Sequence, residues 1–304
     1  MKNKKKKLLI VGGTGFLGYH LSKICIKRYD ITSLSLTKPT KERNINKVKY
    51  IICDISKKKN LEKKIKNNYE IVVNLGGYID HKNILRTKNS HFIGCKNLVN
   101  FFKKREIKIF IQIGSSSEYG KINSPHRENL SGKPSTIYGK SKLMASKYLF
   151  KFAKQNKFPF TIIRFYQVYG PKQNNDRMIP YVINSSLKNI NFNCSSGVQN
   201  RDFLFVDDAV KAILKCFDNR SVIGKIFNIG SGRSSNIKRV IMLLNKTIKS
   251  GTPLFGAVKL RADEPINSYP DLRNSKKYLN WKSKITLKKG LDRTILFYKK
   301  KFKV

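Results

Sequence analysis

A short apolar segment that leads directly into three evenly spaced glycines constrains this chain most. Leu8–Val11 has the composition of a buried strand, and Gly12, Gly15 and Gly18 follow it. Where a strand turns into a helix, the first glycine permits the sharp bend, the second lets the backbone approach a pyrophosphate, and the third lets the helix pack on the strand. The free N–H groups at the start of that helix attract phosphate. An ordinary glycine-rich turn is the alternative, but the order of strand, glycines and helix favours a dinucleotide-binding unit.

Apolar and amphipathic segments then alternate along the first half of the chain. The further segments that read as short buried strands are Ile31–Leu36, Val48–Ile52, Ile71–Leu75, Ile107–Gly114 and Phe160–Phe165. Apolar residues recur at spacings of three and four in Arg86–Lys104 and Tyr138–Gln155, which predicts helices. This rhythm predicts an α/β fold with a parallel sheet that is covered by helices on both faces.

After Phe165 the alternation becomes less regular. Proline, asparagine and glycine cluster at Gly170–Asn175, and irregular segments follow at Ile190–Asn200 and Gly251–Tyr269. We therefore expect two domains, a dinucleotide-binding domain at residues 1–165 and a smaller substrate-binding lobe at residues 166–304. The lobe should lie over the carboxyl ends of the strands, with some segments (about residues 203–230) returning to the first domain.

The charge of the chain is strongly positive, with 64 lysines and arginines against 18 aspartates and glutamates and a formal net charge of +46. Such a balance is compatible with nucleic-acid binding. The basic residues, however, are mostly lysines spread along the whole chain, and no segment interleaves them with aromatic residues in a binding pattern. A lysine-rich surface is therefore the better interpretation, and we expect no nucleic-acid partner. An anionic substrate would still gain from the positive field.

The cysteines and the apolar runs indicate the cellular compartment of the protein. Its five cysteines are scattered and never spaced C-x-x-C, which is typical of reduced thiols in a cytoplasm and predicts no structural metal. No apolar run is long enough to cross a bilayer, so no membrane association is expected. The basic start, Met1–Lys7, precedes only four apolar residues before the first glycine, too few for a signal peptide. We expect a cytoplasmic protein.

A tyrosine–lysine pair provides a candidate for proton transfer. Tyr138 and Lys142 are one helical turn apart, which places them on one face of the predicted helix. A free phenol has a pKa of about 10, and a neighbouring ammonium favours the phenolate, which brings proton exchange closer to neutral pH. Such a tyrosine can exchange a proton with a sugar oxygen while hydride moves at the adjacent carbon. The serines in Gly114–Gly120 end a buried strand, where a hydroxyl can hold the same oxygen. Chance spacing and a serine-rich turn that caps the strand are the alternatives.

Together these features resemble the extended short-chain dehydrogenase/reductases, the NAD-dependent epimerase/dehydratase group that acts on nucleotide sugars. The resemblance extends over nearly the whole chain. The matching segments are Gly12–Gly18, Cys53–Ile55, Asn74–Gly77, Ile113–Gly120, Tyr138–Lys142, Arg164–Pro171, Arg201–Asp208 and Phe227–Gly232. The resemblance implies a Rossmann-type doubly wound parallel sheet with a smaller C-terminal α/β substrate lobe, and an enzyme that uses NAD or NADP on a nucleoside-diphosphate sugar.

The resemblance also assigns roles to individual residues. The catalytic set is Ser115, Tyr138 and Lys142, with the tyrosine as acid–base and the lysine also at the nicotinamide ribose. The cofactor-binding set is Gly12, Thr14, Gly15, Phe16, Leu17, Gly18, Ser35, Lys38, Asp54, Ile55, Leu75, Gly76, Gly77, Tyr138 and Lys142. The substrate-binding set is Ser116, Ser117, Gln167, Arg201 and Arg261. The two arginines would grip the diphosphate, which the guanidinium fork fits well.

One departure from the family pattern concerns the choice of cofactor. Ser35 stands where family members carry an acidic residue that binds the adenosine ribose. Without that carboxylate the phosphate of NADP is not repelled, and a nearby base could pair with it. The basic residues that follow are Lys38, Lys41 and Arg43. The sequence therefore slightly favours NADP over NAD.

Two further departures concern the reaction. The family's 4,6-dehydratases carry a glutamate within two residues of the catalytic hydroxyl, whereas Ser116 and Ser117 stand here and Glu118 comes one place later, so the acid that expels water is in doubt. Gln167 and His91 replace asparagines that are common in the family. Gln167 and the pattern around the serines look more like the reductases and synthases of 4-keto-6-deoxy sugars than like UDP-galactose 4-epimerases.

The sequence thus predicts hydride transfer to C4 of a 4-keto-6-deoxy nucleotide sugar, with Tyr138 as proton donor to the ketone oxygen. The main alternative is a 4-epimerase with tightly bound NAD, and a non-catalytic NAD(P)-binding regulator is a remote one. A homodimer is expected, because two predicted helices carry more apolar side chains than one sheet face needs. Those side chains are Phe92, Leu98, Val99, Phe101, Phe102, Leu143, Tyr148, Leu149 and Phe152.

Overall fold

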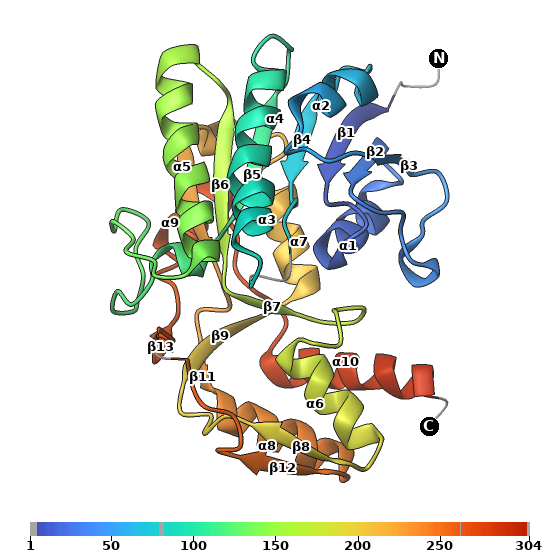
Figure 1. Ribbon diagram of the computed structural model, residues 1–304, viewed down its shortest axis with the longest axis vertical. Coiled ribbons are helices and arrows are strands. Elements are labelled where there is room, and N and C mark those ends of the chain that lie inside the picture. The colour runs from blue at the N-terminus through green and yellow to red at the C-terminus, as the bar shows by residue number, and fades with distance from the viewer. Residues whose placement is uncertain (1–4, 79–81, 262, 303–304) are drawn as a thin grey trace.

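The computed structural model describes residues 5–78, 82–261 and 263–302, so the first four residues of the basic start lie outside the described residues. A parallel sheet of seven strands forms the larger half of the molecule, in the order β10-β6-β5-β4-β1-β2-β3 (Figure 1). The strands are β1 (Lys6–Val11), β2 (Tyr29–Ser35), β3 (Lys49–Ile52), β4 (Ile71–Asn74), β5 (Ile109–Ser115), β6 (Phe160–Phe165) and β10 (Lys225–Ile229). The sheet confirms the predicted Rossmann-type fold, and each predicted strand is present with ends that differ by at most a few residues.

Helices cover this sheet on both faces. They are α1 (Phe16–Cys25), α2 (Lys58–Lys64), α3 (Ile84–Lys88), α4 (Gly94–Phe102), α5 (Ile137–Asn156), α7 (Val206–Leu214) and α9 (Arg273–Leu279). The predicted helix at Tyr138–Gln155 corresponds to α5. The predicted helix at Arg86–Lys104 is divided, because a π-helical turn at Asn89–Ile93 separates α3 from α4. Period-3.6 spacing does not predict such a turn, in which the backbone bonds span one residue more than in an α-helix.

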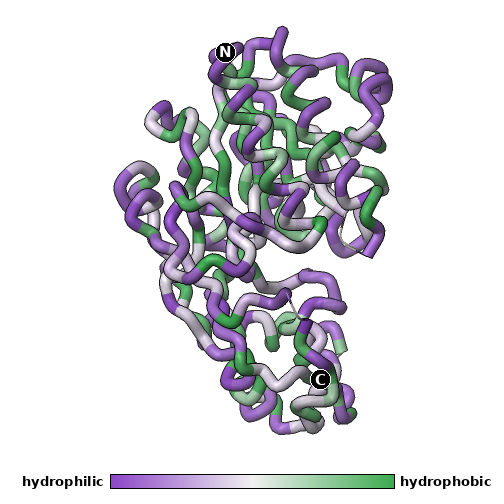
Figure 2. The backbone as a smooth tube through the Cα atoms, turned by 60° about the vertical axis from the view of Figure 1, so that its left-hand side comes forward, coloured by the Kyte–Doolittle hydropathy of each residue, from purple (hydrophilic) through white to green (hydrophobic). Residues whose placement is uncertain are grey.

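The side chains of each strand alternate between two apolar cores. Leu9 and Val11 of β1 point into a core with α2, α4 and α5, while Leu8 and Ile10 point into a core with α1 and α7. This alternation is the period-two geometry of a strand that is buried on both faces. Apolar residues accordingly colour the interior strands in Figure 2, and hydrophilic residues colour the outer turns.

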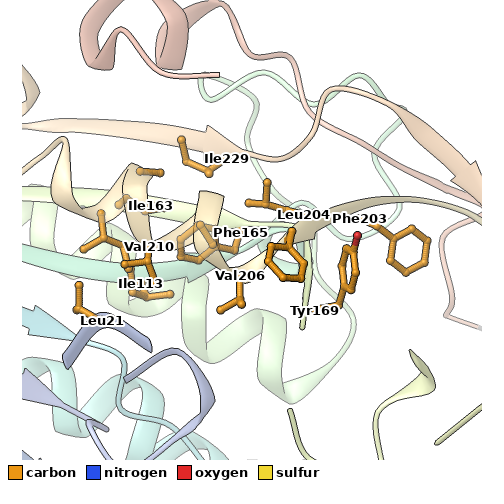
Figure 3. Close-up of a cluster of buried hydrophobic side chains, with 14 of the residues drawn as sticks. Leu21, Ile113, Ile163, Phe165, Tyr169, Phe203, Leu204, Val206, Val210 and Ile229 are labelled. Carbon is orange, nitrogen blue, oxygen red and sulfur yellow. The ribbon is translucent and has the colours of Figure 1, made fainter. Parts of the chain in front are cut away.

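The second core continues without a break into the smaller lobe. Figure 3 shows side chains of the large sheet and its helices in line with side chains of the lobe. Its labelled residues are Leu21, Ile113, Ile163, Phe165, Tyr169, Phe203, Leu204, Val206, Val210 and Ile229, all buried. Because one core serves both parts, the lobe is held firmly against the carboxyl ends of the strands.

The lobe is built on a small sheet of four strands. These strands are β7 (Gln167–Tyr169), β9 (Asn200–Phe205), β11 (Ser234–Asn236) and β13 (Asn267–Ser268). A parallel pair, β8 (Asn191–Cys194) and β12 (Thr252–Phe255), and the helices α6 (Met178–Leu187), α8 (Ile237–Ile248) and α10 (Leu287–Phe302) complete it. The chain re-enters the large sheet between α7 and β10 (Figure 1). In the described ranges, none of the helices has the length and apolar character that a membrane span requires.

Candidate functional site

Of the three evenly spaced glycines after β1, Gly12 and Gly18 are packed too closely for a side chain. Gly12 has φ +77°, and a Cβ there would lie 2.9 Å from the carbonyl carbon and oxygen of Leu75. A Cβ at Gly18 would overlap the carbonyl oxygen of Gly12 and lie 2.5 Å from the Cα of Gly13. At Gly15 the nearest atom, the carbonyl oxygen of Gly12, is 3.2 Å away. Gly12 and Gly18 therefore serve the fold, whereas the space beside Gly15 is open.

This turn fits the phosphates of a dinucleotide. No side chain caps the N-terminus of α1, which begins at Phe16 immediately after Gly15. The open side of Gly15 and the uncapped helix end together form a cradle that a Cβ at Gly15 would partly fill. Thr14 and Leu17 lie on the same turn. The residues present thus suit the cofactor that the sequence predicts.

The end of β2 lies directly beside the glycine turn. The hydroxyl of Ser35 accepts a hydrogen bond from the backbone N–H of Thr14 at 3.3 Å, and Lys38 and Lys41 are exposed beyond it. Arg43 is not available for a cofactor phosphate in this arrangement. Its guanidinium donates to the carbonyl oxygen of Lys172 at 2.5 Å and to the amide oxygen of a lobe asparagine, Asn174, at 2.7 Å. Of the basic residues that follow Ser35, Lys38 and Lys41 therefore remain the candidates for a cofactor phosphate, because a long-range contact holds the side chain of Arg43.

The segment after β3 lies at the same edge of the sheet, since β3 is the neighbour of β2. Asp54 accepts hydrogen bonds from the backbone N–H and the hydroxyl of Ser56 at 2.9 and 2.7 Å, which fixes a tight turn. The side chain of Ile55 is buried against Gly76 and Gly94. The amide of Asn97 on α4 donates to the carbonyl oxygens of Ile55 and Ser56 at 3.0 and 2.8 Å.

His91 lies between the segment after β4 and α5. A Cβ on Gly77 would overlap the imidazole ring, so this glycine is required where it stands. The ring meets the ring of Tyr138 edge-on, with centroids 5.0 Å apart. Its Nε2 lies 3.2 Å from the carbonyl oxygen of Tyr78, which can only accept, so this nitrogen carries the proton. The π-helical turn directs His91 into this position.

The structure brings the three predicted catalytic residues together at the end of β5. The Nζ of Lys142 donates to the carbonyl oxygen of Ile113 at 2.7 Å, two residues before Ser115, and lies 5.9 Å from the ring centroid of Tyr138. Lys142 is buried, and an ammonium has three donors, so one contact with a carbonyl leaves it further bonding capacity. A Cβ on Gly139 would lie 2.5 Å from the carbonyl oxygen of Ser117. The start of α5 is therefore pressed against the serine turn.

The serine turn has a defined geometry. The hydroxyl of Ser115 accepts from the backbone N–H of Ser117 at 3.1 Å, and the carboxylate of Glu118 accepts from the backbone N–H of Ser115 at 2.9 Å. Ser116 and Ser117 are half-buried, but Glu118 is fully buried and points away from them into the protein. The Glu118 carboxylate is therefore bonded within the protein, away from the hydroxyls of Ser116 and Ser117.

The two predicted substrate arginines converge on one carboxylate. Arg201 on β9 is buried and forms an ion pair of 2.5 Å with Oε1 of Glu264. Arg261, whose side chain is 69% exposed, contacts Oε2 of the same carboxylate at 2.6 Å. Gln167 is exposed on β7, which pairs with β9. Both guanidinium groups can therefore bind one anion, and the sequence analysis did not predict that Glu264 lies between them.

Comparison with known proteins agrees with this geometry. A family model described as "NAD dependent epimerase/dehydratase family" matches residues 8–230. A putative UDP-glucose 4-epimerase of Methanocaldococcus jannaschii is 28% identical, over 96% of this chain and 98% of that protein. A CDP-abequose synthase of Salmonella typhimurium is 25% identical, over 95% and 97%. A UDP-glucuronic acid 4-epimerase of Bacillus cereus, solved with UDP-glucuronic acid and NAD, has the same fold with a TM-score of 0.88, 24% identity, and coverage of 97% and 99%. The chain belongs to the NAD dependent epimerase/dehydratase family.

Proposed function

We propose that this protein is an NAD(P)-dependent enzyme that moves hydride at C4 of a nucleoside-diphosphate sugar. The observation that carries the proposal is the meeting of Lys142, Tyr138 and the Ser115 turn beside a glycine cradle that fits a dinucleotide. When bound, the nicotinamide supplies or accepts the hydride. The protein exchanges the proton, positions the reacting groups and binds the substrate.

In the proposed reaction Tyr138 exchanges a proton with the oxygen on C4. The hydroxyl of Ser115 holds the same oxygen, and Lys142, whose Nζ lies 5.9 Å from the ring centroid of Tyr138, also binds the nicotinamide ribose. Arg201 and Arg261 bind the diphosphate between their two guanidinium groups. In the structure both groups contact the carboxylate of Glu264. We assign Ser116, Ser117 and Gln167 to the sugar, and the cofactor contacts to the glycine turn, Asp54–Ile55 and Leu75–Gly77.

The names of the relatives favour epimerisation over reduction. The sequence favoured reduction at C4, yet the relative from Methanocaldococcus jannaschii and the structural neighbour from Bacillus cereus are both named 4-epimerases. Reduction remains the second candidate, because a CDP-abequose synthase is also among the relatives and Gln167 is exposed toward the lobe. Both reactions use the same residues.

One experiment separates these reactions. Purified protein is incubated with UDP-glucose, with UDP-glucuronic acid, and with a 4-keto-6-deoxy nucleotide sugar plus NADPH. Inversion at C4, followed by NMR, with no net change in nicotinamide absorbance identifies an epimerase. Stoichiometric loss of that absorbance with the keto sugar identifies a reductase. Absence of both activities over a panel of nucleotide sugars, in a protein that binds NAD or NADP, would overturn the proposal in favour of a regulator.

The cofactor preference is open to the same kind of test. The family and the NAD-bound neighbour support NAD. The earlier expectation of a slight preference for NADP now rests on Ser35 and on the exposed Lys38 and Lys41 alone. If it holds, fluorescence titration gives NADPH a dissociation constant no larger than that of NADH, and Lys38→Ala with Lys41→Ala weakens NADPH only. A clear NADH preference that these changes leave unaltered contradicts it.

We also propose a homodimer through α3 and α5. Most of the side chains that suggested it belong to the core of one chain, because Leu98, Val99, Phe101, Phe102, Leu149 and Phe152 are buried. The exposed apolar side chains are instead Ile84 and Leu85 on α3, at 65% and 68%, and Met144 and Phe150 on α5, and the two helices lie in contact. Sedimentation equilibrium should return about twice the mass of one chain. A monomer that cofactor does not change would refute the dimer.

A further inference from the structure

Glu118 is a fully buried carboxylate three residues after the proposed catalytic serine. Its Oε1 accepts a hydrogen bond from the backbone N–H of Ser115 at 2.9 Å. Its Oε2 accepts from the hydroxyl of Ser146 at 2.7 Å and from the Nε and Nη2 of Arg164 at 2.9 and 2.8 Å. The Glu118 carboxylate thus accepts hydrogen bonds from its own turn and from two other elements.

These donors come from the elements that carry the proposed active site. Ser115 ends β5, Arg164 lies on the adjacent strand β6, and Ser146 lies on α5. Ser146 follows Lys142 by four residues, and Lys142 follows Tyr138 by four, so the three share one face of the helix. One carboxylate therefore joins the backbone of Ser115 to the helix face that presents the tyrosine and the lysine.

The surroundings of Glu118 leave it little freedom. A Cβ on Gly114 would overlap Oε1, so the strand passes as close to the carboxylate as a glycine allows. The guanidinium of Arg164 is buried and lies 4.7 Å from the ring centroid of Tyr119. A buried ion pair of this kind often adds no more stability than apolar residues of the same size, and geometric specificity is one reason for a protein to keep one.

We propose that Glu118, with Ser146 and Arg164, is a positioning group that sets the register between Ser115 and the Tyr138–Lys142 face of α5. This inference rests on the proposed function. Glu118 acts through its neighbours and does not contact the reacting atoms. Its loss should leave the cofactor turn and the paired arginines intact while the proton-transfer geometry becomes looser.

Ser146→Ala tests this most directly, because it removes one hydrogen bond and leaves the charge pair in place. Ser141→Ala is the matched control, since Ser141 is equally buried on the same helix and its hydroxyl has no hydrogen-bond partner in the described part of the chain. A small misplacement of reacting groups can cost up to about a hundredfold in rate. We expect Ser146→Ala to lower kcat about tenfold or more, with KM and the NAD dissociation constant within about twofold of wild type.

Other variants distinguish the possible failures. Tyr138→Phe tests the proposed function itself, and its failure to reduce turnover would remove the basis of the inference. If Tyr138→Phe is inactive but Ser146→Ala and Ser141→Ala have equal kcat, the positioning role alone is wrong. Glu118→Gln, checked for folding by thermal unfolding, should lower kcat at least as far as Ser146→Ala. A folded Glu118→Gln protein with wild-type kcat would also overturn the inference.

Discussion

Replacing Gly15 with alanine should separate the fold of the glycine turn from its proposed role in binding the cofactor. Gly15 has φ −77° and ψ 179°, which alanine adopts without strain. Among the described residues, the one atom within 4 Å of an added Cβ is the carbonyl oxygen of Gly12, at 3.2 Å. Alanine reduces the entropy of the unfolded chain, worth about 0.4–1 kcal/mol, and this offsets a similar loss at the helix N-cap. We expect the free energy of unfolding to change by less than about 1 kcal/mol, or roughly 2–4 °C in Tm.

The effect on the cofactor should be much larger. The open side of Gly15 is the space that a pyrophosphate would occupy beside the uncapped start of α1. A methyl group there should weaken NAD binding at least about tenfold, which is about 1.4 kcal/mol. Titration calorimetry measures the dissociation constant directly. Thermal unfolding with NAD in excess gives a second measure, because each tenfold loss of affinity removes about 1.4 kcal/mol of ligand-induced stabilisation.

Gly18→Ala is the contrasting variant. Its Cβ would overlap the carbonyl oxygen of Gly12 and approach the Cα of Gly13 to 2.5 Å, and backbone cannot rotate away as a side chain can. We expect this variant to lose about 1–3 kcal/mol of stability even without NAD. A folded Gly15→Ala protein that binds NAD as tightly as wild type would refute the reasoning. So would a Gly15→Ala protein that is destabilised as strongly as Gly18→Ala.

Three further predictions follow from the site and its surroundings. Tyr138→Phe should lower kcat by about 10²–10⁴-fold with cofactor binding intact, and a rate within about threefold of wild type on the true substrate would contradict its role. Arg261→Met should raise KM about tenfold at unchanged kcat, because this exposed arginine shares Glu264 without supporting the core, and an unchanged KM would remove it from the substrate site. Burial lowers the pKa of His126, whose Nδ1 accepts from Tyr166, so below a pH of about 6.5 the unfolded chain binds more protons than the folded one. The free energy of unfolding should therefore fall with falling pH, by up to about 1.4 kcal/mol per pH unit. Urea unfolding at several pH values should show that this free energy depends less on pH in His126→Gln than in wild type. An equal dependence on pH in the two proteins would contradict the prediction.

The sheet could be predicted from the sequence because its strands are buried on both faces. Segments such as Ile71–Asn74 and Ile109–Ser115 are mostly apolar and are buried throughout, so no solvent face interrupts the pattern. The glycine turn could also be predicted, since Gly12 and Gly18 meet local steric requirements of the turn. The π-helical turn at Asn89–Ile93 was not readable, because it depends on how His91 packs against Gly77 and Tyr138.

The contacts that complete the site join residues far apart along the chain. Arg201 meets Glu264, 63 residues later, and Arg43 meets Asn174, 131 residues later. Local spacing carries no information about such pairs, so neither the contact of Arg43 with Asn174 nor that of Arg201 with Glu264 could be predicted from the sequence. The catalytic candidates could be identified from local spacing, because Tyr138 and Lys142 are one helical turn apart and Ser115 ends a strand.

The scarcity of acidic residues makes the placement of each one informative about the reaction. The sequence has only 18 acidic residues and 64 basic ones, yet Glu118, Asp202 and Asp208 are fully buried. Asp202 accepts from the backbone N–H groups of Ser231 and Gly232, and Asp208 accepts from two backbone N–H groups ahead of α10. Glu118 accepts from the Nε and Nη2 of Arg164, so its carboxylate is engaged in a buried ion pair. A 4,6-dehydratase needs a proton donor beside the substrate, and the glutamate nearest to Ser115 in the sequence is committed to the fold, which favours reactions that need only the Tyr138 proton.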